Sequence, residues 1–242
     1  MSVIVSGYEE EAKSYDTERF GSAGGQLINK IQLEIVRKLV EPEGKKILDV
    51  ACGTGRFTSD LFEHGADIIG IDAAENMLKV ARKKNPKIKF ESGDIFNLRY
   101  KGKTFDVVTG LKIIMHLSEY KKVIKEMIRV AKDDGLIVFE IPNRTCIWSL
   151  LMNVRKRVFY KAEHEHKIKK PSFTYSSIKK DLAGMGLKID KSVGMFYLPE
   201  TLFRKSPRLV LPIFYRIERF LQFLPARWGE NVYLKVVKCG KT

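Results

Sequence analysis

A turn of small residues after a short apolar segment could bring backbone close to a bound molecule. Residues 47–55 read ILDVACGTG, with Asp49 in the apolar segment and Gly53 and Gly55 in the turn, and a predicted helix begins just beyond. Glycine tolerates tight backbone geometry, and a helix N-terminus favours negative charge. A phosphate-binding dinucleotide turn would place a third glycine at Thr58, and a P-loop would add Gly-Lys-Ser/Thr; this motif has neither.

Two more acidic side chains follow the next two predicted strands. Asp72 comes seventeen residues after Gly55, and its carboxylate can accept hydrogen bonds from both ribose hydroxyls of an adenosine. Asp94, together with the backbone amide of Ile95, can address an adenine edge. A dinucleotide-dependent dehydrogenase would explain Asp72 but not Asp94. Either acid alone could merely cap the following helix, whereas acids at three successive strand ends favour a nucleoside-containing ligand.

Strands and helices alternate along the part of the chain that carries these acids. Apolar residues at three- and four-residue spacing predict helices, and short apolar runs predict strands. The predicted helices cover residues 26–40, 56–64, 74–84, 118–131 and 175–185, and the predicted strands cover residues 47–50, 66–74, 88–94, 104–111, 135–142, 187–194 and 231–238. Strands that are apolar on both faces are typical of a parallel sheet covered by helices, so we expect an α/β fold. The last two strands can pair at the sheet edge if the residues between them form a cap.

Four segments of the chain resemble the ordered motifs of class I S-adenosylmethionine-dependent methyltransferases. They are ILDVACGTG, GIDAAENML, SGDIFNL and FDVVTGLKIIMHL, and the resemblance covers roughly residues 40–142. It implies a Rossmann-like seven-stranded sheet with the last strand antiparallel, plus a C-terminal cap around the last strands. It also implies a single methyltransferase domain over residues 1–242. N-terminal lid helices would occupy residues 1–40, a cofactor-binding core residues 41–142, and a substrate and cap region residues 143–242.

The same resemblance implies S-adenosyl-L-methionine as the cofactor and assigns roles to individual residues. Asp49 would orient the loop and the methionine amine, Gly53 and Gly55 would face the methionine part, and Asp72 would bind the ribose. Asp94 would address the adenine edge. The other implied cofactor-binding positions are Ala51, Thr54, Ala73, Met77, Ile95 and Leu111, of which Met77 and Ile95 would contact the adenine faces.

The N-terminal segment points to one branch of this family. Residues 9–20, EEEAKSYDTERF, are similar to the opening of small-molecule methyltransferases of the quinone-biosynthesis type, in which a tyrosine and an arginine close over the cofactor. Tyr15 and Arg19 match that pair, and Tyr8 is a second candidate for the tyrosine. An amphipathic helix that only packs on the domain is the alternative interpretation.

Methyl transfer requires mainly that the acceptor atom and the methyl group are held in the right relative position. It requires a base only when the acceptor arrives protonated. Histidine suits that role because its pKa lies near neutrality. The candidates are His116, which follows the fourth predicted strand, and His166, which lies with His164 in the charged run EHEHKIKK. Local hydrogen bonding at a helix start is the alternative for His116, and a solvated loop is the alternative for His166. Related quinone O-methyltransferases often carry acids beside the first histidine; Lys112-Ile113-Ile114-Met115-His116 has none, so no metal is implied.

Positive charge is concentrated in the last third of the chain. Residues 1–150 carry 24 Lys and Arg against 22 Asp and Glu, whereas residues 151–242 carry 20 against 7. Within this part, residues 204–228 combine basic side chains with apolar ones at helical spacing: Leu209, Val210, Ile213, Phe214, Ile217, Phe220, Leu221 and Leu224. Such a helix can lie on an anionic membrane, and packing of its apolar face on the core is the alternative. Three cysteines without paired spacing favour a reducing cytoplasm. The basic amphipathic segment adds the expectation of peripheral contact with the inner face of the membrane.

Three functions are consistent with these features. The leading hypothesis is a methyltransferase with a small or lipid-like acceptor. An RNA methyltransferase that uses the basic C-terminal third, and a catalytically silent protein that binds the cofactor or a partner, remain as alternatives. Nucleic acid is the less favoured substrate, because the Asn/Asp-Pro-Pro-Tyr/Phe motif that grips a flipped base is absent from the TGLKIIMH segment. The sequence indicates neither the acceptor atom nor the oligomeric state.

Overall fold

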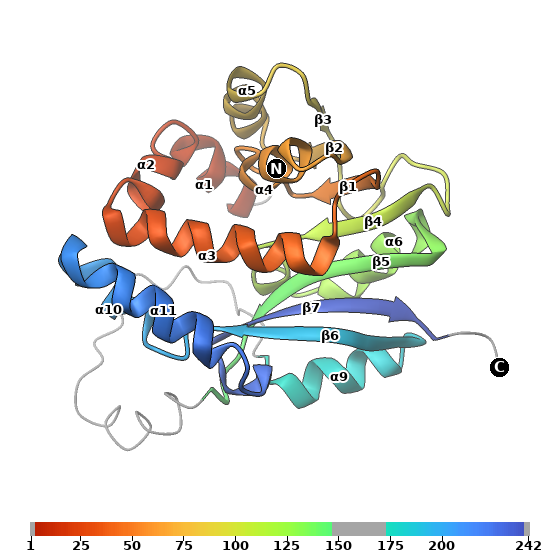
Figure 1. Ribbon diagram of the computed structural model, residues 1–242. Coiled ribbons are helices and arrows are strands. Elements are labelled where there is room, and N and C mark those ends of the chain that lie inside the picture. The colour runs from red at the N-terminus through yellow and green to blue at the C-terminus, as the bar shows by residue number, and fades with distance from the viewer. Residues whose placement is uncertain (1–2, 147–172, 240–242) are drawn as a thin grey trace.

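The computed structural model describes residues 3–146 and 173–239 (Figure 1). Within them, seven strands form one sheet in the order β3-β2-β1-β4-β5-β7-β6. The strands are β1 Lys46–Val50, β2 Asp67–Asp72, β3 Lys89–Ser92, β4 Phe105–Gly110, β5 Ala131–Pro142, β6 Leu187–Met195 and β7 Asn231–Lys238. The first five strands pair in parallel, and β7 runs antiparallel to both β5 and β6. The predicted sheet with an antiparallel last strand is therefore confirmed.

Helices cover both faces of the sheet. Helices α3 (Ala23–Val40), α4 (Arg56–Glu63) and α5 (Glu75–Lys84) bury apolar side chains on one face. Helices α6 (Tyr120–Val130) and α9 (Tyr175–Ala183) do so on the other. The predicted helices were therefore correct in type and place, with α3 beginning three residues earlier than its apolar spacing indicated.

Two short helices precede α3 and lie beside its N-terminal end in Figure 1. They are α1 (Val3–Glu11) and α2 (Tyr15–Phe20). A small apolar cluster joins them to the start of α5, and Ala12 and Met77 are buried within it. The segment thus packs across the carboxyl ends of the strands, where a parallel sheet presents its ligand sites.

The residues between β6 and β7 form a cap that lies alongside α3 (Figure 1). The cap consists of α10 Glu200–Lys205, the short 3₁₀ turn η2 Arg208–Val210, α11 Leu211–Leu221 and a second 3₁₀ turn, η3 Ala226–Trp228. Its approach to α3 is close, because a Cβ on Gly24 would lie 2.0 Å from the carbonyl oxygen of Phe203. The predicted pairing of β6 with β7 around a cap is confirmed.

Helix α11 turns only some of its apolar side chains towards the core, where Phe214 packs against the ring of Phe203. The residues that it buries are Leu211 and Glu218, and the Glu218 carboxylate accepts hydrogen bonds from the backbone amides of Phe196 (2.6 Å) and Tyr197 (3.3 Å). Burial raises the pKa of Glu218. Packing of the whole apolar set on the core is therefore wrong for most of its members, since five of the eight are exposed: Leu209, Ile213, Ile217, Phe220 and Leu224.

Candidate cofactor site

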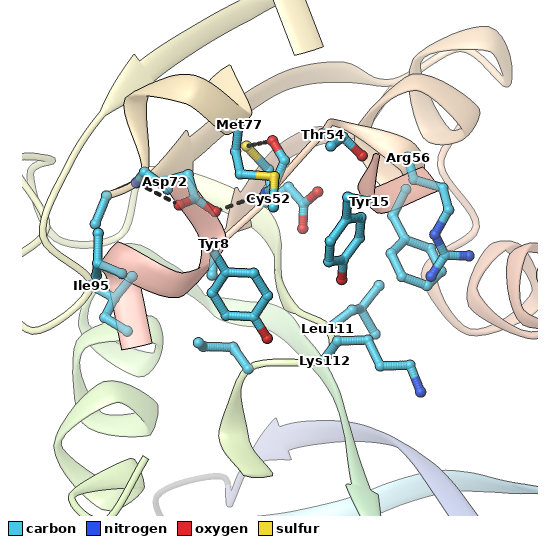
Figure 2. Close-up of a pocket in the computed structure, with 18 of the residues that line it drawn as sticks. Tyr8, Tyr15, Cys52, Thr54, Arg56, Asp72, Met77, Ile95, Leu111 and Lys112 are labelled. Atoms are coloured by element: carbon cyan, nitrogen blue, oxygen red, sulfur yellow. Dashed lines mark hydrogen bonds between the residues drawn. The ribbon is translucent and has the colours of Figure 1, made fainter. Parts of the chain in front are cut away.

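A cavity of about 310 Å³ lies where β1, β2 and β4 end, beneath α1 and α2. Figure 2 shows residues from all of these segments pointing into it. Eleven of the thirteen predicted cofactor-binding residues line this cavity: Tyr15, Asp49, Ala51, Gly53, Thr54, Asp72, Ala73, Met77, Asp94, Ile95 and Leu111. Side chains far apart in the sequence therefore meet in one place, as expected when parallel strands end at a common edge.

Asp72 connects the glycine turn to the start of α5. Its Oδ2 accepts a hydrogen bond from the Gly53 amide and its Oδ1 accepts one from the Ala74 amide, both at 2.8 Å. Burial raises the pKa of Asp72, and these amide donors oppose the effect. A carboxylate has about four acceptor positions, so two remain for a ligand. Asp72 thus binds the residue before α5 without capping that helix, and it lines the cavity.

Asp49 lies deep under the turn and is held by two threonines. Thr58 Oγ1 donates to Asp49 Oδ2 at 2.6 Å, and Thr109 Oγ1 donates to Asp49 Oδ1 at 2.7 Å. Burial raises the pKa of Asp49 from 3.8 to about 6, although both threonine hydrogen bonds lower it. An ammonium group of a ligand in the cavity would lower the pKa of Asp49 and so favour its ionised form.

The two glycines of the turn have different roles. Both have a left-handed backbone, with φ of 57° at Gly53 and 75° at Gly55. A Cβ on Gly53 would meet no atom within 4 Å, so this residue leaves room for a ligand. A Cβ on Gly55 would lie 2.8 Å from the Phe90 ring, so Gly55 is required for packing. Gly55 is not among the residues that line the cavity, and its contact with the methionine moiety stays a prediction.

Helices α1 and α2 are fastened to the turn and to α5 by acidic side chains. The Glu9 carboxylate accepts hydrogen bonds from the amides of Glu75 (2.6 Å) and Asn76 (2.8 Å), and so caps α5 from outside. Asp16 accepts a hydrogen bond from Thr54 Oγ1 at 2.9 Å and pairs with Lys84. Helix α5 has no side-chain cap of its own, so Glu9 supplies what its N-terminus lacks.

The predicted tyrosine and arginine of this segment contact each other, but only the tyrosine lines the cavity. Tyr15 lines the cavity, as does the second candidate, Tyr8. The Arg19 guanidinium lies 3.9 Å from the centre of the Tyr15 ring and pairs with Glu11 at 3.2 Å, outside the cavity lining. Arg19 therefore supports Tyr15 from behind, which differs from the direct contact that the resemblance implied.

His116 stands behind Tyr8 in the short 3₁₀ turn η1 (Ile114–His116). Its Nε2 lies 3.3 Å from the Tyr8 hydroxyl, and the two rings are nearly perpendicular. His116 is not among the residues that line the cavity, so it reaches the cavity through Tyr8. Burial raises the pKa of Tyr8 to about 12, which keeps its phenol protonated at neutral pH. His166 and His164 lie outside the described residues.

Two basic residues that the sequence reasoning did not select also line the cavity. Arg56 donates a hydrogen bond to Asn29 Oδ1 at 2.6 Å, and its guanidinium lies 3.8 Å from the centre of the Phe57 ring. Lys112 Nζ lies 2.6 Å from Oε1 of Glu140, which is fully buried. The sequence did single out Glu140, because it is the one acidic residue in the apolar strand GLIVFEIP, and a carboxylate buried there needs a cation as its partner.

No metal centre is formed by the described residues, in which three or more His, Cys, Asp or Glu side chains nowhere gather at a spacing that could hold an ion. Over the same ranges, no helix is long and apolar enough to cross a bilayer. Positive charge at the cavity comes instead from Arg56 and Lys112.

The glycine turn, the acids at three strand ends and the sheet order together define a family. A family model described as "Methyltransferase domain" matches residues 41–191. The chain belongs to this methyltransferase domain family, and its sheet is that of the class I S-adenosylmethionine-dependent enzymes.

Several curated relatives are methyltransferases that are named for quinones. A ubiquinone biosynthesis O-methyltransferase from Coxiella burnetii is 30% identical over 122 residues, which cover 49% of this chain and 52% of that protein. A demethylmenaquinone methyltransferase from Renibacterium salmoninarum is 32% identical over 143 residues, which cover 59% and 60%. The chain therefore spans between half and three fifths of the length of these relatives.

Solved structures establish the fold over nearly the whole chain. A SAM-dependent methyltransferase from Thermotoga maritima superposes with a TM-score of 0.67 at 21% identity, covering 96% of this chain and 98% of that one. A magnesium protoporphyrin IX methyltransferase from Synechocystis, solved with bound SAH, gives a TM-score of 0.58 at 18% identity, covering 89% and 84%.

Proposed function

We propose that this protein is an S-adenosylmethionine-dependent methyltransferase that acts on a small or lipid-like acceptor. The observation that carries the proposal is the cavity at the strand ends, where Asp49, Gly53 and Asp72 are held in place by Thr58, Thr109 and backbone amides. The names of the curated relatives support an amphiphilic ring compound as the acceptor class.

The residues present fit this cofactor. Asp72 has acceptor positions left for the ribose hydroxyls, and Gly53 leaves open space where a side chain would obstruct the ligand. Asp94 and the cavity-lining side chains of Met77 and Ile95 would hold the adenine, and Asp49 the methionine ammonium. When bound, S-adenosylmethionine supplies a methyl group already activated on a positively charged sulfur.

The protein's own contribution is position and exclusion of water. Displacement at the methyl carbon needs the acceptor atom in line at about 3 Å, and such positioning alone can supply effective molarities of 10⁵ M or more. Tyr8 and Tyr15 cover the cavity from above, and Glu9 and Asp16 fasten their helices. When the acceptor arrives protonated, His116 would take up the proton by way of the Tyr8 hydroxyl.

Methyl transfer from labelled S-adenosylmethionine tests the proposal and its alternatives together. Label that enters a lipid or small-molecule fraction supports it, and label in RNA would favour the RNA methyltransferase instead. Cofactor binding without transfer to any fraction would favour the catalytically silent protein.

We also propose that the cap meets an anionic membrane, which would place this protein at the inner face of the cytoplasmic membrane. Phe223, Leu209 and Phe220 leave 89%, 88% and 73% of their surface exposed, and the two phenylalanine rings pack against each other. This apolar patch lies among basic side chains. In the described part of the chain, four of them form no ion pair: Lys205, Arg208, Arg216 and Arg227.

An anionic bilayer interface attracts a surface that combines basic and exposed apolar side chains, as this cap does, and each nearby basic residue adds about 1 kcal/mol. Flotation with anionic and neutral vesicles measures this directly. Removing two charges in Arg208→Ala/Arg216→Ala should weaken binding to anionic vesicles roughly 30-fold. The matched control Lys83→Ala/Lys125→Ala removes exposed charges from α5 and α6 and should not. A wild-type protein that ignores anionic vesicles at low salt would refute the membrane contact.

A further inference from the structure

A buried ion pair stands at one end of the cavity. Figure 2 shows Ile95 and Asp72 at one side, and Arg56 and Lys112 at the other. The Lys112 ammonium lies 2.6 Å from Glu140 Oε1 and keeps 31% of its side-chain surface exposed, while Glu140 keeps none. Lys112 lines the cavity, and the Glu140 carboxylate beside its ammonium is shielded from solvent.

Two features of this ion pair are energetically unfavourable by themselves. Lys112 has a left-handed backbone, with φ of 62°, which is costly for a residue with a side chain. Glu140 lies within the sheet, opposite Tyr233 in the β5–β7 register, where a carboxylate without a cation would be strongly destabilising. Such costs concentrate at functional sites, which gives the pair a role beyond packing.

Two cations line this end of the cavity, and only one of them is needed to bind the carboxylate of the cofactor. The proposed cofactor brings a single carboxylate, and two cations line this end. Arg56 adjoins the glycine turn and is fixed between Asn29 and Phe57, so it suits that carboxylate. An ammonium has three N–H donors, so Lys112 can bind a second anion while it pairs with Glu140.

We propose that Lys112, positioned by Glu140, binds the methyl acceptor as an oxygen anion, so that the substrate is an acidic phenol or enol. The inference rests on the proposed function. The hydroxyl loses its proton to solvent as it binds beside the ammonium. Its oxygen then forms a bond to the methyl carbon while the carbon–sulfur bond breaks and leaves its electron pair on sulfur. The anion and the sulfonium both become neutral, so for an acceptor bound as its anion no metal is needed and His116 has no proton to take up.

Binding of 4-nitrophenol to the protein saturated with S-adenosylhomocysteine tests this, because the phenolate absorbs visible light and the phenol does not. A cation within about 4–6 Å lowers the pKa of an acid by one unit or more, so the wild-type protein should bind the phenolate at least about tenfold more tightly than the phenol. Lys112→Met should lose this preference, and Lys112→Arg should keep it. Lys103→Met is a matched control, since Lys103 also has a left-handed backbone (φ 57°) and pairs with Asp133.

Calorimetry with S-adenosylhomocysteine separates the outcomes. If Lys112→Met loses the anion preference and keeps its cofactor affinity, the proposal stands. If it loses cofactor affinity instead, Lys112 holds the cofactor and the proposal is overturned. Equal binding of phenol and phenolate by the wild type also overturns it. Failure of the wild type to bind S-adenosylhomocysteine would instead defeat the proposed function. Should Lys112→Met not fold, Lys112→Met/Glu140→Gln removes both charges and answers the same question.

Discussion

Cofactor affinity should fall as pH is lowered through 6, because the proposed partner of the methionine ammonium is the ionised form of Asp49. The pKa of this carboxyl is raised to about 6 in the unliganded protein by burial. An ammonium beside it favours ionisation, so binding is accompanied by proton release. Since the ionised fraction falls from about nine tenths at pH 7 to about one tenth at pH 5, the affinity should fall about tenfold over that interval.

The stability of the unliganded protein should change in the opposite sense. The folded protein retains a proton on Asp49 between about pH 4 and pH 6 that the unfolded chain has already released. The free energy of unfolding therefore falls as pH rises through this window, by about 3 kcal/mol for the shift of Asp49 from its usual value. As pH rises through this window, ionisation of Asp49 therefore strengthens cofactor binding and weakens the stability of the unliganded protein.

Calorimetric titration with S-adenosylhomocysteine between pH 5 and pH 8 measures the first effect. Asp49→Asn should bind more weakly at pH 8 and show a flatter profile, and any remaining dependence reports on Asp72, whose pKa burial also raises. Asp106→Asn is a matched control, because Asp106 is paired with Lys132 outside the cavity. A steep profile retained by Asp49→Asn would refute the role given to this residue.

Three further predictions concern the same site. Asp72→Ala should lose two hydrogen bonds to ribose and weaken cofactor binding by about 2–4 kcal/mol in calorimetry; unchanged affinity in a folded variant would contradict the assignment. His116→Ala should lower kcat by about 10²–10⁴-fold for an acceptor that arrives protonated, with little change in cofactor affinity, and full activity would show that His116 only supports Tyr8. Glu9→Gln should weaken the cap on α5 by about 1 kcal/mol and speed cofactor dissociation in stopped flow, and an unchanged rate would mean that α1 does not close the site.

The local pattern of the sequence was sufficient for the sheet and for most of the cavity. The apolar runs indicated where each strand ends, and Asp49, Asp72 and Asp94 all lie within two residues of the ends of β1, β2 and β3. The packing role of Gly55 was missed, because spacing alone cannot separate a glycine that faces a ligand from one that packs against Phe90. That distinction depends on where β3 and its neighbours place their side chains.

The contacts that sequence reasoning missed join residues far apart in the chain. Lys112 pairs with Glu140, Tyr8 meets His116, and Glu9 caps α5, and none of these has a local signature. Periodicity likewise predicted an amphipathic α11 but not its orientation. Backbone amides of residues 196–198 require an acceptor, so Glu218 turns inward, and Phe220 on the same helix is exposed.

Transfer of a labelled methyl group from S-adenosylmethionine into extracted cell lipids and small molecules, compared with RNA from the same cells, tests the central claim most directly. Label should appear in an organic-soluble product, and Asp72→Ala should abolish it while Asp106→Asn should not. Label confined to RNA, or label that persists in Asp72→Ala, would contradict a small or lipid-like acceptor methylated at this cavity.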